Sequence, residues 1–202
     1  MFLDGPNGLS DPDLVAARTE LLSQQAEALT QWRQTTQALR PDLPIPEFDP
    51  AEAGARARIL LVLPQATRAA DSAEGSGFVS VDNDDRVSAN LWNLREHIGL
   101  HDRVLLTNLV PWYLGPDVKP SRLDLQHGGR ALINLLPSLR DLHAIVLLGG
   151  EAQKTWDTYV APAVRTRSLV LRCPLPTARS VNRTGPADKA STVLARARDL
   201  VM

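Results

Sequence analysis

The amino-acid sequence predicts an α/β fold, a three-layer sandwich with a four-stranded parallel sheet and an N-terminal helical extension. Two observations predict it. Four largely apolar runs, at residues 58–63, 103–107, 142–148 and 168–172, are typical of strands buried on both faces. Segments with helical spacing of apolar residues separate these runs, and such alternation is typical of a parallel sheet built by crossover connections.

Composition limits the class of protein. The chain has 202 residues, of which 44% are apolar and 22% charged, as in ordinary globular domains. Its formal net charge of −1 gives no support for tight, non-specific binding to nucleic acid, so any basic face must be local. Cys173 is the single cysteine, which excludes an internal disulfide. We expect a cytoplasmic monomer without a targeting or membrane-spanning segment.

Residues 1–47 are predicted to form a helical arm and a connector that precede the main domain, residues 48–202. A helix is expected over residues 13–39, because apolar residues recur there at helical spacing: Leu14, Ala17, Leu21, Ala28 and Leu29. The next segment, residues 40–50, contains four prolines and is therefore expected to be extended.

The elements of the main domain follow from its apolar runs. The first strand is predicted to end at Pro64. The loop after it, residues 64–87, is long for a compact domain, which is typical of a functional loop. Helices are expected over residues 88–98, 125–136 and 187–201, with another starting at Glu151 after the Gly149-Gly150 turn.

The carboxyl ends of parallel strands are where such folds bind ligands. The strand-end loops here are residues 64–87, 108–116, 149–151 and 173–180. Asn108 stands at the end of the second run. Its carboxamide offers a donor and an acceptor, which suits the edge of a nucleobase better than a phosphate. The alternative is that Asn108 only caps a turn.

No cofactor or metal is expected. His97 and His101 lie four residues apart, but no third ligand lies nearby in the sequence. Neither a Gly-rich dinucleotide motif nor a Walker loop follows the first strand, which argues against dinucleotides and nucleoside triphosphates.

Four segments in the strand-end loops resemble the uracil-DNA glycosylase superfamily, in particular its bacterial uracil-DNA glycosylase-like branch. The resemblance extends from Phe48 through the C-terminal helix. The segments that carry it are Gly77-Phe78-Val79-Ser80 with Asp82-Asn83-Asp84-Asp85; Asn108-Leu109-Val110-Pro111-Trp112-Tyr113; Leu147-Leu148-Gly149-Gly150 with Ala152-Gln153; and Cys173-Pro174-Leu175-Pro176 followed by Asn182.

The resemblance implies an enzyme of base-excision repair that turns uracil or a damaged base out of DNA, including single-stranded DNA, and hydrolyses its N-glycosidic bond. It implies that Phe78 stacks on the base and that Asn108 pairs with the uracil edge and rejects cytosine. A Phe in a Gly-flanked loop can also be simply packed in the interior.

Two positions depart from the family pattern. After the first strand the family carries a carboxylate or Asn before Pro-Gly, whereas this chain has Gln65, which can position a water but is a poor base. Where the family has His-Pro-Ser-Pro, this chain has Cys173, whose thiol is a weak donor. We take Cys173 as a substitute for that His, or as a small packed residue, and not as a nucleophile.

Two explanations of these departures stay open. In one, a different acid activates the water, with Asp82 and Asp84 as candidates, although acidic residues before a helix, including Asp85, are also typical helix caps. In the other, the chain has lost its chemistry and binds nucleic acid or nucleotide without turnover. A small-molecule enzyme on the same architecture is a third possibility.

DNA contacts are expected from basic side chains near the strand ends, with Leu175 as an apolar wedge that enters the vacated base stack. The basic residues are Lys119, Arg179 and Arg183, with Arg122 and Arg172 nearby.

Overall fold

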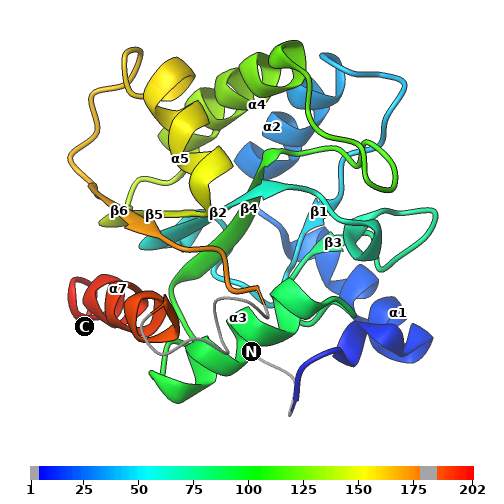
Figure 1. The fold of residues 1–202 in the computed structure, drawn as a ribbon. Helices are drawn as coiled ribbons and strands as arrows, with labels where there is room; N and C mark the ends of the chain where they lie inside the picture. Colours follow the sequence, from blue (N-terminus) through cyan, green and yellow to red (C-terminus); the bar gives the residue numbers. More distant parts are fainter. Residues whose placement is uncertain (1–4, 178–185) are drawn as a thin grey trace.

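The computed structural model describes residues 5–177 and 186–202, and in this part of the chain a four-stranded sheet forms the centre of the molecule (Figure 1). Its strands are β2 (Ile59–Gln65), β4 (Val104–Val110), β5 (Ala144–Leu148) and β6 (Leu169–Cys173). They lie in the order β4-β2-β5-β6, and all neighbours are parallel. The predicted α/β fold with a four-stranded parallel sheet is therefore confirmed.

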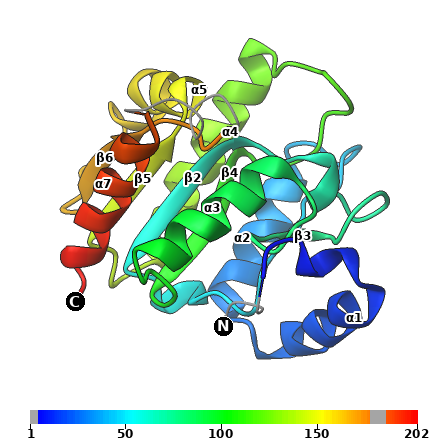
Figure 2. The same cartoon turned by 60° about the horizontal axis from the view of Figure 1, so that its bottom comes forward.

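Helices cover both faces of the sheet because alternate strand residues point to opposite sides. On one face, Ile59, Leu61 and Leu106 pack against α3 (Arg86–His97) and α7 (Pro186–Asp199). Figure 2 shows α3 lying along β2 and β4. On the other face, Leu60 and Leu105 pack with residues of three segments: α2 (Glu27–Gln37), α4 (Arg122–Leu135) and the π-helical turn η6 (Trp156–Val160), which follows α5 (Gly150–Thr155).

Gly128 sets the close approach of α4 to the sheet. A Cβ atom at this position would lie 2.2 Å from the carbonyl oxygen of Leu109 in β4. No side chain fits at that distance, so Gly128 allows the backbone of α4 to rest directly on the strand that carries Asn108.

Two strands extend beyond their predicted ends. β4 continues through Asn108 to Val110, and β2 continues through Pro64 to Gln65. Proline is tolerated in β2 because the pairing with β5 has already ended at Val62, so no partner strand there needs its missing N–H. Pairing with β4 goes on to Gln65. Asn108 therefore lies within a strand, and not in a turn after it.

The N-terminal segment forms separate helices where one was predicted. α1 (Pro12–Glu20) and the 3₁₀ turn η2 (Leu21–Gln24) precede α2, and the chain is extended at Gln25 and Ala26. The Gln25 side chain donates to the carbonyl oxygen of Phe48 at 3.1 Å, which holds this break against the main domain. Short elements complete the described chain: η1 (Gly8–Ser10), β1 (Glu47–Phe48), η3 (Gly54–Arg56), η4 (Arg68–Ala70), β3 (Phe78–Val79) and η5 (Leu136–Ser138).

The predicted arm is packed into the core. Leu29 and Trp32 of α2 are buried in the same cluster as Leu60, and the Trp32 indole donates to the Ala131 carbonyl oxygen at 2.7 Å. Arg40 forms an ion pair with Asp124 of α4 at 2.5 Å. A domain boundary between residues 47 and 48 stays a prediction. Among the described helices, none combines the length and apolar character needed to cross a membrane.

Candidate functional site

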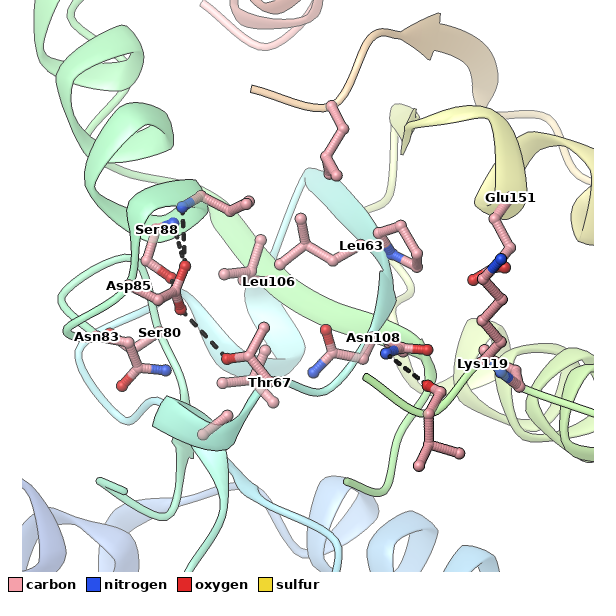
Figure 3. Close-up of a pocket in the computed structure, with 18 of the residues that line it drawn as sticks. Leu63, Thr67, Ser80, Asn83, Asp85, Ser88, Leu106, Asn108, Lys119 and Glu151 are labelled. Carbon is pink, nitrogen blue, oxygen red and sulfur yellow. Dashed lines mark hydrogen bonds between the residues drawn. The ribbon is translucent and has the colours of Figure 1, made fainter. Parts of the chain in front are cut away.

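A pocket of about 560 Å³ lies at the carboxyl ends of β2 and β4 (Figure 3). Aliphatic residues form part of its wall, and polar residues from several elements face the same space. Figure 3 shows Asn108 near the middle, with Asp85 and Ser88 on one side and Lys119 and Glu151 on the other. The aliphatic lining includes Leu63, Val79, Val87, Leu106 and Leu175; the polar lining includes Gln65, Thr67, Ser80, Asn83, Asp85, Ser88, Asn108, Lys119 and Glu151.

Asn108 is the buried polar side chain in this pocket that has no protein partner within the described residues. It is only 5% exposed, and it sits opposite Leu63 in the β2–β4 pairing. By contrast, the Asn83 amide donates to the Phe78 carbonyl oxygen at 2.8 Å and its oxygen accepts from Ser76 at 2.6 Å. Buried carboxamides are normally satisfied, so Asn108 has capacity for a ligand whereas Asn83 shapes its loop.

Gln65 also faces the pocket, from the last position of β2. Its Nε2 atom lies 3.5 Å from the carbonyl oxygen of Val118, a contact at the limit of hydrogen bonding. The side chain is therefore only weakly held and can turn toward a bound molecule or water.

Asp85 lines the pocket as the N-cap of α3. One of its oxygens accepts from the backbone N–H groups of Val87 and Ser88 at 2.8 and 2.9 Å. The other accepts from the hydroxyls of Ser88 and Thr67 at 2.9 and 3.2 Å (Figure 3). The capping alternative is thus what the structure shows for Asp85. Four donors occupy both oxygens of this carboxylate, so it has little capacity to accept a further hydrogen bond from a ligand or water.

Phe78 does not face the pocket, which corrects the expected arrangement. Its side chain is 2% exposed, and β3 pairs it with Glu47 of β1. The neighbouring Val79 and Ser80 line the pocket instead. Residues next to each other in a strand point to opposite sides. Val79 therefore faces the pocket, and the ring of Phe78 points away from it.

Asp82 is also directed away from the pocket, contrary to the expectation that it activates water. It is 1% exposed, and its carboxylate pairs with Arg18 of α1 at 2.7 Å, while Arg18 also pairs with Asp49. Burial raises the pKa of the Asp82 carboxyl, and the Arg18 guanidinium opposes that rise. Asp82 therefore links α1 to the loop that follows β3. Asp84 is exposed and does not line this pocket.

Cys173 is fully buried at the end of β6, within the core cluster beneath α7, and does not line the pocket. Burial raises the pKa of its thiol to about 12. Its carbonyl oxygen accepts from the Gly149 N–H at 2.8 Å and from Gln153 Nε2 at 2.9 Å. The structure therefore shows Cys173 as the packed residue of the two alternatives, and its side chain does not replace a donor in the pocket.

Two predicted DNA-binding residues line the pocket and two lie outside the described residues. Leu175 packs against the core cluster and Lys119 is exposed on the loop between β4 and α4. Gly149 has a φ of +88°, and a Cβ there would lie 3.2 Å from Leu175 Cβ, so this glycine allows the two loops to approach. Arg179 and Arg183 fall in residues 178–185, which the structure does not describe.

Glu151 is a pocket residue that the sequence interpretation missed. It is the second residue of α5 and is partly buried, and no described residue pairs with its carboxylate. The available signal was its place directly after the Gly149-Gly150 turn at a strand end.

Across the described residues, no three His, Cys, Asp or Glu side chains gather in a way that could hold a metal ion.

Comparison with known proteins supports the same conclusion as the fold. A comparison with curated proteins finds no match. A family model described as the uracil DNA glycosylase superfamily matches residues 52–199, well over half of the chain. These residues include the whole sheet and every residue that lines the pocket. The chain therefore belongs to the uracil-DNA glycosylase superfamily.

Proposed function

We propose that this protein binds uracil, or a related damaged base, turned out of DNA, and hydrolyses its N-glycosidic bond in the pocket at the ends of β2 and β4. The observation that carries the proposal is the Asn108 carboxamide, which is buried, faces the pocket and has no partner among the described residues. A base edge satisfies such a group. Membership in the superfamily supports the general class of function.

The uracil edge matches a carboxamide in donor and acceptor order. Asn108 Nδ2 donates to the uracil O4 oxygen while Oδ1 accepts from N3–H. Cytosine presents the opposite order, a donor at N4 and an acceptor at N3, and so does not fit the same orientation. Aliphatic side chains contact the faces of the base, since no aromatic ring of the described residues lines the pocket: these side chains are Leu63, Val79, Leu106 and Leu175.

Glu151 is the carboxylate that we assign to water activation. Asp85 already accepts four hydrogen bonds, and Asp117, the remaining acid in the lining, is exposed on the outer loop. Water adds to C1′ of the sugar and gives its proton to the Glu151 carboxylate. The C1′–N bond breaks with its electron pair on the base, whose anion is stabilised by the Asn108 N–H group. Gln65 orients the water.

The test is excision from a single-stranded oligonucleotide that contains one uracil, followed by alkaline cleavage of abasic sites. Asn108→Ala should lower the rate by about 10²–10³, the usual cost of losing one donor to developing charge. Asn93→Ala is the matched control, because Asn93 is exposed on α3 outside the pocket. Equal rates for the two variants, or no product at stoichiometric protein, would contradict the proposal.

A second candidate is a superfamily member that binds the same base without turnover. The burial of Asp82 and Cys173 away from the pocket favours it. This candidate predicts that uracil-containing oligonucleotides bind more tightly than thymine controls, in a salt-sensitive and Asn108-dependent way, with no abasic product.

A further inference from the structure

We infer that the segment 116–121, between β4 and α4, is the edge that contacts DNA, with Val118 as the apolar wedge and Lys119 as a phosphate contact. The inference rests on the proposed function, since it names how duplex DNA meets the same pocket. It moves the wedge from Leu175 to a different loop.

Val118 is an apolar side chain exposed at the edge of the pocket. It is 46% exposed although it lines the same space as Asn108. A base turned out of a duplex leaves a gap in the stack, and an inserted apolar side chain fills that gap and discourages the base from returning. An exposed aliphatic group beside the base pocket is placed for this role.

The loop is built to hold Val118 outward. Asp117 has a φ of +57° and Gly115 a φ of +107°, two left-handed positions that shape a sharp turn just before it. Pro116 and Pro120 fix the backbone on either side. The two prolines restrict the backbone on both sides of Val118, so less conformational entropy is lost when Val118 enters the stack.

The charges of the segment fit a phosphate backbone. Lys119 and Arg122 are exposed, and neither forms an ion pair with a described residue. Arg172, by contrast, is engaged with Asp157 at 2.7 Å on another part of the surface. Asp117 opposes Lys119 and Arg122, so residues 116–122 carry a net charge of +1, which favours an anion only slightly. Lys119 lines the pocket and Arg122 does not, so we assign the phosphate contact to Lys119.

Leu175 is less suited to the wedge role. It is partly buried, it packs against the core cluster that contains Cys173, and it lies against Gly149. Its movement into a base stack would break these contacts. Leu175 is therefore a wall of the pocket, whereas the exposed Val118 side chain can enter the stack without breaking contacts to the core clusters.

The experiment compares excision from matched single-stranded and duplex oligonucleotides that carry one uracil. Only the duplex requires a base to be unstacked and unpaired, so Val118→Ala should lower the duplex-to-single-strand rate ratio by about 10- to 100-fold. Leu123→Ala is the matched control: Leu123 is 56% exposed in the first turn of α4, after the segment, and does not line the pocket. Its ratio should stay at the wild-type value.

A second readout does not need turnover. 2-Aminopurine beside the uracil becomes fluorescent when it loses its stacking partner, so the wild type should raise its emission in the duplex and Val118→Ala should raise it much less. An unchanged ratio and unchanged fluorescence would overturn the wedge while leaving the proposed function intact. An equal loss on both substrates would also overturn it, because Val118 would then serve the base pocket itself. Absence of any uracil preference in single strands would instead overturn the proposed function.

Lys119 is tested through the salt dependence of binding to the duplex. Lys119→Gln should reduce the slope of log K against log salt by about 1, the loss of one phosphate contact. Lys154→Gln is the control, because Lys154 is exposed on α5 outside the pocket. Equal slopes for both variants would remove Lys119 from the DNA contact.

Discussion

Two groups of polar residues in this protein differ in how their hydrogen bonds are used. Around Arg18 of α1, Asp49 and Asp82 are both buried and both pair with the guanidinium group, and Ser80 donates to Asp49 at 2.5 Å. In the pocket, Asn108 and Glu151 have no described protein partner. The first group stabilises the fold, while the second retains capacity for a ligand.

Position in a family motif therefore does not fix the role of a side chain. Phe78, Ser80 and Asp82 belong to one motif segment, yet two of them are directed away from the pocket. Alternation along β3 and the ion pair of Asp82 with Arg18 decide which of these residues faces the pocket. Four substitutions test this division, in order of decreasing effect.

Glu151→Gln should have the largest effect. Removal of a general base lowers kcat by about 10²–10⁴, while KM for a single-stranded uracil substrate should change little, since the amide keeps the shape of the side chain. Steady-state kinetics at several pH values measures this. A wild-type kcat in Glu151→Gln would show that Glu151 does not activate the water, and Gln65 would then be the next residue to test.

Asp82→Asn should lower the free energy of unfolding and leave the rate of uracil excision nearly unchanged. Loss of a hydrogen bond to a charged partner costs about 1.5–3 kcal/mol of unfolding free energy, which urea denaturation measures. Single-turnover excision at a temperature where the variant is folded should stay within a few-fold of the wild type. A fall of 10²-fold or more would restore Asp82 as the acid that activates water.

Phe78→Leu should have a smaller effect, confined to packing. A hydrophobic replacement of similar size at a buried position costs less than about 1.5 kcal/mol. If the ring stacked on the base, its loss would weaken binding by about 1–3 kcal/mol per base, which is at least fivefold. We therefore expect an unchanged dissociation constant for a uracil-containing single strand, measured by fluorescence anisotropy.

Substitution of Cys173 should have no effect on excision activity near neutral pH. Its thiol, with a pKa raised to about 12, should not react with a disulfide reagent in the folded protein, and Cys173→Ala should keep excision activity. Because the folded pKa lies above the unfolded value of about 8.5, the folded state keeps its proton longer, and the thiol's contribution to stability is lost as pH rises from about 8.5 toward 12.

Unfolding by urea at pH 7 and pH 10 measures this loss. The wild type should lose about 1–2 kcal/mol more than Cys173→Ala between the two pH values. Equal losses in both proteins would mean that the thiol is accessible enough to ionise in the folded state.

Much of the architecture followed from local sequence alone. The apolar runs predicted the strands of the sheet because strands buried on both faces must be apolar at every position. The ends of those strands were harder to place. Pro64 marked the end of β2 in the sequence, yet pairing with β4 tolerates it because β5 no longer needs its N–H group.

By itself, the sequence determined the fold class and placed Asn108 near the carboxyl edge of the sheet, because apolar periodicity and motif order are local properties of the chain. Only the tertiary structure decided that Phe78, Asp82 and Cys173 face away from the pocket and that Glu151 faces it. The reason is that a side chain's role depends on its partners. Arg18 lies 64 residues from Asp82, and no local pattern shows that they pair.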